Sequence, residues 1–173
     1  MRDLIEGILN YERWSGTEDV DWHPHDLNAI TRNVVEDIQD VVRAKSQELE
    51  FVPADGPLVV VADEPLLREA IGNLVSNASK YTPEGGRIIL RTTNSWPEFN
   101  IIVEDNGPGI AREDLDKFFM PFVRLREARR QSGSGLGLSL VRKIAERHGG
   151  QTYVESELGE GSRFIIRVPE MTL

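Results

Sequence analysis

The sequence predicts an α+β fold, a two-layer sandwich in which about three helices pack on one face of a mixed, mostly antiparallel sheet. Two observations indicate it. Helix-like segments, with apolar residues three and four positions apart, are mixed along the chain with pairs of short strand-like runs. The 173 residues, of which 39% are hydrophobic, can bury one core but hardly two. We therefore expect one globular domain with a short appendage.

Composition and charge exclude several classes of function. The formal net charge of -9 repels nucleic-acid phosphates and anionic membranes, so any phosphate that the protein binds must be met by a local device. The absence of cysteine rules out disulfides and thiolate metal sites. No apolar run approaches the ~20 residues that span a bilayer, and no signal peptide is visible. We expect a cytoplasmic protein with no nucleic-acid partner.

The appendage is expected to be the end of a helix. Apolar residues repeat at helical spacing over residues 1–14, and Ser15 and Gly16 break the pattern. Residues 15–25 are expected to form a linker. Because the pattern is already helical at Met1, we expect the chain to be a piece of a longer protein.

Two helices and a strand are expected next. Asp26 can cap the first helix, and Asp63 can cap the second, whose first turn tolerates Pro65. A buried strand is expected between them, from Leu58 to Val61. The apolar face of the first helix comprises Leu27, Ile30, Val34, Ile38 and Val41. That of the second comprises Leu67, Ile71, Leu74, Ala78 and Tyr81.

The second half of the chain is expected to contain two strand pairs with a helix between them. That helix opens near Gly135 and ends at His148, where Gly149 and Gly150 stop it. The strands are expected near residues 87–93, 99–104, 151–156 and 162–168.

The helix that Asp63 caps is the first place that indicates chemistry. Glu69, Asn73, Asn77 and Lys80 recur at spacings of four, four and three, so they share one face. Asparagine is a poor helix former, and its side-chain carbonyl can reach a ligand or metal at the rim of the apolar stripe. For this helix alone, ordinary surface residues remain the alternative interpretation.

A glycine-rich turn follows the strand that ends at Glu104. Asp105 starts it, Gly107 and Gly109 follow, and the carboxylate can meet the amino group of a base while the backbone comes close to the ligand. Taken alone, the segment could also be a simple turn, because such clusters are common in loops.

A second glycine-rich segment, from Gly133 to Leu138, opens the next helix. Backbone N–H groups at a glycine-rich helix start can cradle phosphate with help from the helix dipole. The segment is neither a P-loop nor a dinucleotide fingerprint. Positive charge gathers just upstream, as phosphate contacts require, although a solvated charged loop is the alternative. The residues are Arg124, Arg126, Arg129 and Arg130.

Taken in order, these segments resemble the ATP-binding domain of sensor histidine kinases, in the superfamily shared with gyrase, mismatch-repair and heat-shock chaperone ATPases. The segment from Asn73 to Pro83 resembles the asparagine box. Asp105 to Gly109 and Gly133 to Leu138 resemble the two glycine boxes, and Phe119 to Arg124 resembles the phenylalanine box. The match covers about residues 26–170, and the order and spacing of four boxes are far more specific than any one of them.

The resemblance implies a Bergerat-type ATP-binding fold and a set of roles. Asn77 would hold Mg²⁺ against the phosphates of ATP, with support from Asn73, and Lys80 would contact phosphate. Tyr81 would pack near the base or ribose, and Asp105 would read the adenine amino group. Asn73, Lys80 and Arg124 are implied in catalysis. The other implied ATP-binding positions are Gly107, Gly109, Ile110, Arg124, Arg129, Arg130, Gly133, Gly135, Leu136, Gly137 and Leu138.

The resemblance also implies the organisation and the reaction. Residues 26–173 would be the catalytic domain with a lid at about 111–134, and residues 1–14 the end of the dimerisation and phosphoacceptor helix. The domain would bind Mg-ATP and donate the γ-phosphoryl group to a histidine on that helix, outside this chain, in two-component signalling with a response regulator receiver domain. The parent would be a homodimer, and the chain by itself could be a monomer.

Two alternatives are retained. The ATPase and serine-kinase branches of the superfamily place a glutamate four residues before the metal asparagine, where this chain has Asn73; Glu69 is a less favourable substitute. Hydrolysis should therefore be poor. A non-catalytic ATP-sensing module is the second alternative, and the intact boxes argue against it.

The three histidines are not expected to accept phosphate. His23 and His25 flank Pro24 in an expected loop, and His148 is expected to pack at a helix end or cap it. We therefore predict that this chain does not phosphorylate itself.

Overall fold

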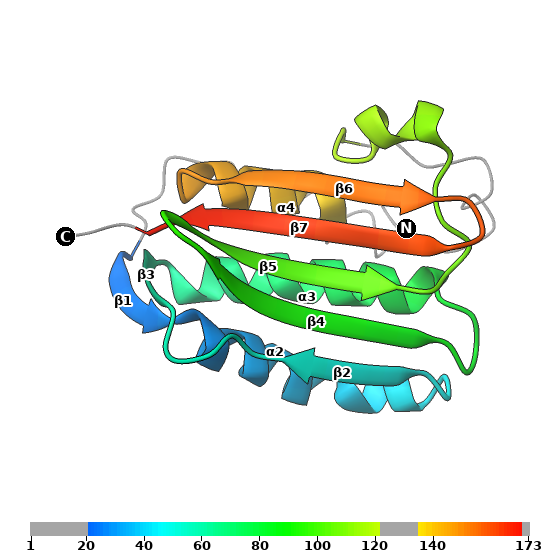
Figure 1. Cartoon of the computed structure of the whole chain (residues 1–173), viewed down its shortest axis with the longest axis horizontal. Helices are drawn as coiled ribbons and strands as arrows, with labels where there is room; N and C mark the ends of the chain where they lie inside the picture. The colour runs from blue at the N-terminus through cyan, green and yellow to red at the C-terminus, as the bar shows by residue number, and fades with distance from the viewer. Residues whose placement is uncertain (1–20, 122–134, 171–173) are drawn as a thin grey trace.

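The computed structural model describes residues 21–121 and 135–170. One layer is a five-stranded sheet of order β2-β4-β5-β7-β6, and α2, α3 and α4 cover one of its faces (Figure 1). β2 and β4 are parallel, and the other neighbouring strands are antiparallel. The predicted two-layer α+β sandwich is confirmed. The strands of this sheet are β2 (Glu48–Val52), β4 (Arg87–Ser95), β5 (Glu98–Asp105), β6 (Gln151–Glu157) and β7 (Gly161–Pro169).

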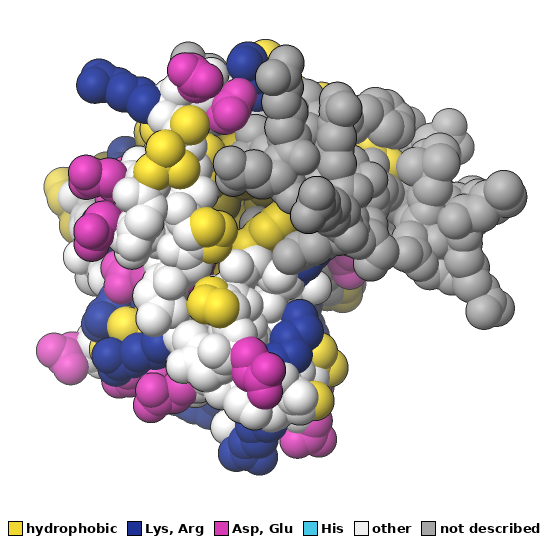
Figure 2. Space-filling view, turned by 90° about the vertical axis from the view of Figure 1, so that its right-hand side faces the viewer, with side chains coloured by type: hydrophobic (Ala, Val, Ile, Leu, Met, Phe, Trp, Pro, Cys, Tyr) yellow, Lys and Arg dark blue, Asp and Glu magenta, His cyan; other side chains and the backbone are white. Residues whose placement is uncertain are grey.

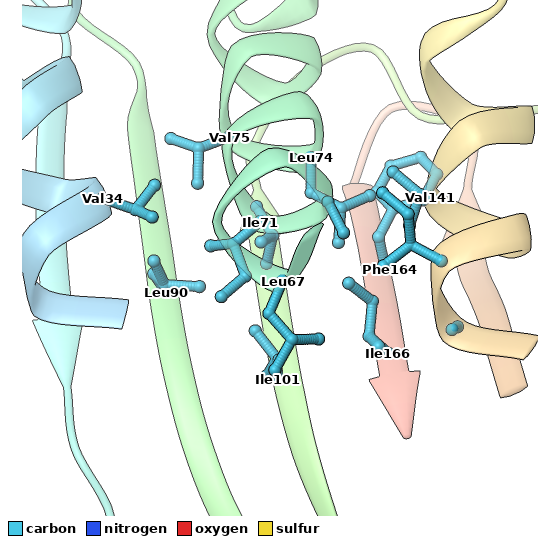
Figure 3. Close-up of a cluster of buried hydrophobic side chains, with 14 of the residues drawn as sticks. Val34, Leu67, Ile71, Leu74, Val75, Leu90, Ile101, Val141, Phe164 and Ile166 are labelled. Carbon is cyan, nitrogen blue, oxygen red and sulfur yellow. The ribbon is translucent and has the colours of Figure 1, made fainter. Parts of the chain in front are cut away.

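The helices bury their apolar stripes against the sheet. α3 (Glu64–Tyr81) lies between α2 (Leu27–Arg43) and α4 (Gly137–Arg147), and its residues Leu67, Ile71 and Leu74 point into the core shared with Ile101 and Phe164 (Figure 3). Burial of these side chains is the main source of stability. No helix within residues 21–121 and 135–170 combines the length and apolarity needed to cross a membrane.

A separate two-stranded sheet replaces the loop that was expected around Pro24. His23 and His25, expected in a loop, lie in β1 (His23–Asp26), which pairs antiparallel with β3 (Val59–Ala62). The pairing supplies hydrogen bonds to both backbones. β3 also begins one residue later than expected, and Val59 is 52% exposed, so this strand is not buried along its whole length.

The helix predictions are confirmed with corrections at three positions. In α2, Val42 is fully buried and Val41 is 56% exposed, although Val41 was expected in the core. Residues three and four positions after Ile38 both fit the helical period, and in the packed structure it is the fourth, Val42, that faces the core. Tyr81 is only partly buried at the end of α3. α4 begins at Gly137, two residues after the predicted start.

The face of the sheet opposite the helices is covered by charged side chains. Ile102 and Ile165 point away from the helices, yet they are only 4% and 8% exposed. Glu104 pairs with Arg163 at 3.2 Å and with Arg91 at 3.4 Å. Arginine stems can cover apolar surface while their guanidinium groups stay in water and pair with carboxylates.

Candidate functional site

The expected ligand residues of α3 depend on how that helix begins and ends. Asp63 is the N-cap, and its Oδ1 accepts a hydrogen bond from the backbone N–H of Leu66 at 3.0 Å. Pro65 occupies the first turn, where its missing N–H costs nothing. The helix ends at Thr82, whose backbone turns to an extended conformation. Asn73, Asn77 and Lys80 therefore lie in the C-terminal half of α3.

Asn73 connects α3 to the start of α4. Its Nδ2 donates to the backbone oxygen of Glu69 at 2.9 Å and to the Glu69 carboxylate at 3.1 Å. Its Oδ1 lies 2.9 Å from the place where a Cβ at Gly137 would stand. The glycine thus allows α4 to begin directly beside the asparagine. The asparagine-bearing face of α3 therefore contacts the second glycine-rich segment at the start of α4.

Asn77 is partly buried, and its side chain makes no hydrogen bond within the described part of the chain. Its amide oxygen is a hard donor of the kind that Mg²⁺ accepts, and phosphate oxygens and water would supply the remaining ligands. Within the same part of the chain, no group of three or more acidic or histidine side chains could hold a metal ion by itself. The site fits a cation that arrives with a phosphate ligand.

The first glycine-rich turn is fixed at the end of β5. Asp105 Oδ1 accepts the backbone N–H of Gly107 at 2.9 Å, and Asn106 Oδ1 accepts that of Arg87 at 2.7 Å. A Cβ at Gly107 would stand 3.3 Å from the carbonyl oxygen of Tyr81. The turn therefore lies directly against the C-terminal end of α3, and it brings Asp105 and Tyr81 into one region.

Burial raises the pKa of Asp105, while the backbone N–H groups of Gly107 and Ser162 act in the opposite direction by stabilising the carboxylate. A desolvated carboxylate with spare acceptor capacity suits recognition of a hydrogen-bond donor on a ligand. Perturbed carboxylates of this kind are enriched at functional sites.

Gly109 and Ile110 are held by the β6–β7 turn. Gly109 has φ +71, and a Cβ there would stand 2.0 Å from the carbonyl oxygen of Glu157, so only glycine fits. The N–H of Ile110 donates to Ser156 Oγ at 2.8 Å, and the Ile110 side chain is buried in the core. Its predicted contact with a cofactor stays a prediction.

The second glycine-rich segment is described from Gly135 onward. Gly135 has φ +73, Leu136 is buried, and Leu138 is partly buried against the core. Four predicted site residues, Arg124, Arg129, Arg130 and Gly133, lie outside the described residues, as does most of the predicted lid.

The start of the predicted lid is anchored to the sheet. η1 (Arg112–Lys117) leads to Phe118 and Phe119, whose ring centroids lie 5.7 Å and 6.4 Å from that of Phe164. These aromatic contacts attach the beginning of the predicted lid segment to the core.

Figure 2 faces the end of the molecule that carries these features: a few hydrophobic side chains lie among backbone and uncharged polar atoms near its centre, and most of the Lys, Arg, Asp and Glu side chains lie around the periphery. Sequence reasoning missed Gln47 and Ser79, which are hydrogen-bonded to each other at the C-terminal end of α3. Both are buried polar residues. Ser79 lies inside the segment that resembles the asparagine box but received no role there, and no local pattern in the sequence marks Gln47.

Comparisons with known proteins agree with this geometry. Residues 62–172 match the family described as histidine kinase-, DNA gyrase B-, and HSP90-like ATPase. The chain is 37% identical over 172 residues to the adaptive-response sensory kinase SasA of Synechococcus sp. (strain JA-3-3Ab), covering 98% of this chain and 45% of SasA. It is 38% identical over 143 residues to the histidine protein kinase DivJ of Caulobacter vibrioides, covering 80% of this chain and 24% of DivJ. The chain thus spans less than half the length of these relatives.

Solved structures show the same fold. The catalytic domain of the histidine kinase ThkA superposes with a TM-score of 0.77 at 29% identity, covering 87% of this chain and 98% of that one. Full-length ShkA in complex with AMPPNP gives a TM-score of 0.86 at 28% identity, covering 98% and 36%. ThkA in complex with the response regulator TrrA gives 0.79 at 26%, covering 98% and 47%.

Proposed function

Because the chain belongs to the histidine kinase-, DNA gyrase B- and HSP90-like ATPase family and is a catalytic ATP-binding domain of the sensor histidine kinase type, we propose that it binds Mg-ATP at the end of α3 and donates the γ-phosphoryl group to a histidine outside this chain. The acceptor would lie on the dimerisation helix of the parent protein, of which residues 1–14 would be the end. Residues 26–173 would form the catalytic domain, joined by a linker over 15–25.

The convergence of three motifs on α3 is the observation that supports this proposal. Gly137 lies against Asn73, and Gly107 lies against the carbonyl of Tyr81. The C-terminal end of α3 is therefore bordered by the turn that carries the partly buried carboxylate of Asp105, and the side of α3 that carries Asn73 is bordered by a glycine-rich helix start, at which phosphate is favoured. A base and a polyphosphate require these two environments side by side.

Each residue would contribute positioning or charge. Asp105 would accept a hydrogen bond from the amino group of adenine, Lys80 would neutralise phosphate charge, and Asn77 would hold Mg²⁺. The metal, when bound, supplies neutralisation of the charge that develops on the transferring group. Phosphoryl transfer needs little more than this, so no nucleophile within the domain is required.

The residue at position 73 favours transfer over hydrolysis. It is an asparagine, and its amide occupies the nearest carboxylate, that of Glu69, through a 3.1 Å hydrogen bond. A carboxylate engaged in this way is a poor base for activating water. The ATPase reaction is therefore the second candidate, and an ATP-sensing module without transfer is the third.

The proposed partner downstream is a response regulator receiver domain, because ThkA, a relative in fold and sequence, is known in complex with the response regulator TrrA. ATP and such a partner place the proposed reaction in the cytoplasm. The parent is proposed to be a homodimer through its dimerisation helices.

The test combines binding with transfer. We expect calorimetric titration with Mg²⁺ and AMPPNP to give one binding site, and Asn77→Ala to weaken it. With ATP and a separately supplied histidine-bearing dimerisation domain from a SasA relative, we expect an acid-labile phosphohistidine on that domain only. Phosphate release without an acceptor would favour the ATPase candidate, and binding without transfer the sensing module. A phosphohistidine formed on this chain alone would contradict the proposed division of labour.

A further inference from the structure

The turn between α2 and β2 places a buried amide behind the candidate site. Gln47 is only 5% exposed, and its Nε2 donates to the carbonyl oxygens of Ser79 at 2.9 Å, Thr82 at 2.6 Å and Pro83 at 3.4 Å. Its Oε1 accepts a hydrogen bond from Ser79 Oγ at 2.8 Å. Lys45 adds a hydrogen bond from its Nζ to the Ser79 carbonyl at 3.1 Å.

These contacts satisfy one of the carbonyls that α3 leaves open in its last turn, that of Ser79, and two carbonyls just beyond the helix, those of Thr82 and Pro83. The last carbonyls of a helix have no partner within it, and burying them without one is costly. Here one side chain from a segment 32 positions away supplies the donors. Its carbonyl oxygen in turn fixes the hydroxyl of Ser79, so the amide is satisfied at both ends.

The Gln47 side chain projects from a rigid turn. The backbone N–H of Gln47 donates to Val42 at 3.2 Å, and that of Glu48 donates to Gly86 at 2.9 Å. Ser46, between Lys45 and Gln47, has φ +54, a conformation that places the turn close to α3 at some cost in backbone strain. The turn is thus connected both to the end of α2 and to the segment before β4.

The end of α3 that Gln47 holds is the part that meets the site. Asn77, Lys80 and Tyr81 belong to its last two turns, and the Tyr81 carbonyl contacts the Gly107 turn. Thr82 packs against Gly86 so closely that a Cβ at Gly86 would stand 2.3 Å from Thr82 Cγ2. A shift of this end would therefore move the expected metal ligand and the turn that carries Asp105 together.

We propose that Gln47 and Ser79 form a positioning pair that sets the end of α3 and thereby the nucleotide affinity of the domain, without touching the nucleotide. This rests on the proposed ATP site. Nucleotide sites lose affinity when their ligand residues are displaced by even a fraction of an ångström, because several contacts must form at once. The pair is distinct from the residues that the resemblance assigns to ATP.

The chain offers a matched control at its other end. Asn28 is likewise a buried amide, 6% exposed, and its Nδ2 donates to the carbonyls of Ala54 at 3.3 Å and Gly56 at 2.8 Å. It also accepts a hydrogen bond from Thr92. Asn28 lies at the start of α2, in the half of the molecule away from the Asp105 turn (Figure 1). Its loss should destabilise the fold without moving the site.

The experiment compares Gln47→Met, Ser79→Ala, the double variant and Asn28→Leu, each at a temperature where circular dichroism shows it folded. We expect Gln47→Met to raise the Kd for AMPPNP with Mg²⁺ by about tenfold. The double variant should bind no more weakly than Gln47→Met, because the two residues act as one unit. Asn28→Leu should lower the unfolding temperature and leave the Kd unchanged.

A second readout separates this proposal from the proposed function. The amide NMR signals of Tyr81 and Gly107 in the free protein should shift in Gln47→Met and stay in place in Asn28→Leu. A wild-type Kd in Gln47→Met, or an equal loss of affinity in Asn28→Leu, would overturn the positioning role. Failure of the wild-type chain to bind AMPPNP would instead overturn the proposed function, and the amide signals would then decide the positioning question alone.

Discussion

Asp105 shows how a single residue trades stability against recognition. Its pKa is raised by burial, so the folded protein holds a proton there more tightly than the unfolded chain. By linkage, the stability tied to this residue falls as pH rises through the raised pKa, and at neutral pH the ionised group costs free energy. A neutral isostere should remove that cost.

We therefore predict that Asp105→Asn keeps or raises the unfolding temperature while it weakens nucleotide binding. An asparagine can accept from the Gly107 N–H with its oxygen, but it then turns an amino group toward the amino group of adenine. Such a mismatch costs about 1–3 kcal/mol, or roughly 5- to 160-fold in affinity. Thermal unfolding and calorimetric titration of the same sample measure both effects. A variant that binds as tightly as the wild type would exclude Asp105 from base recognition.

The pH dependence of binding gives a check within the wild-type protein. Since a protonated Asp105 cannot accept on both oxygens, affinity should fall as pH is lowered toward the raised pKa, before an ordinary carboxylate with a pKa near 3.8 would protonate. Asp105→Asn should lack this dependence.

At this scale, the sequence predicted the residues whose partners are near in the chain. Asp26 and Asp63 cap their helices through hydrogen bonds to residues two and three positions on. Gln47 could not be found in this way, because its partners lie 32 to 36 positions away and depend on packing. Val41 and Val42 fit the helical period equally well, so only the packed core distinguishes them.

Among the elements, the contact between α3 and the start of α4 depends on Gly137. A Gly→Ala change inside a helix normally stabilises it by about 0.5–1 kcal/mol. At Gly137 the new Cβ would stand 2.9 Å from Asn73 Oδ1, so the asparagine would have to move. We predict that Gly137→Ala changes the free energy of unfolding little and lowers phosphoryl transfer or nucleotide affinity at least severalfold. Urea unfolding and the transfer assay measure the two quantities.

Gly72 is the matched control for this change. It also lies within a helix, but a Cβ there would meet nothing within 4 Å. Gly72→Ala should therefore gain the helix stabilisation and leave binding and transfer as they are. Equal activity in both variants would mean that Asn73 tolerates displacement, and its proposed role would have to be abandoned.

The elements that the sequence missed are short and depend on distant pairing. β2 has only five residues, and it pairs in parallel with β4, from which β3 and α3 separate it along the chain. β1 has four residues and includes Pro24, and it exists through its pairing with β3. The long hairpin of β4 and β5 was predicted, because two strand-like runs follow each other directly in the sequence with a loop containing Pro97 between them.

Across the whole molecule, the two helices that border the site also meet at the opposite end. α3 starts there at Asp63, and α4 ends there at His148, whose Nε2 accepts the backbone N–H of Asp63 at 3.2 Å. The Nδ1 of His148 is paired with the Ile144 carbonyl at 2.8 Å, so the ring is neutral with its proton on Nδ1. The entering chain joins this end too, through the ring of Trp22, whose centroid lies 5.0 Å from that of His148.

The stability of the molecule should therefore depend on the pH through His148. Burial lowers the pKa of this residue; the Ile144 carbonyl and Asp63 act against that shift, and Arg147 adds to it. Below about pH 6.5 the unfolded chain binds a proton at this position while the folded protein does not. The free energy of unfolding should then decrease as the pH decreases, by up to about 1.4 kcal/mol per pH unit, until the lowered pKa of folded His148 is reached.

Urea unfolding between about pH 7.5 and 5.5, above the range where most carboxylates protonate, measures this slope. The NMR signal of the His148 Cε1 proton supplies the direct test, because it should remain at its neutral position through pH 6.5 in the folded protein. His148→Gln should unfold with a flatter pH dependence in that window. If the His148 signal titrates near pH 6.5 with the fold intact, its ring does not need to be neutral, and the junction of α3, α4 and the entering chain is held mainly by the β1–β3 pairing and the Asp63 cap.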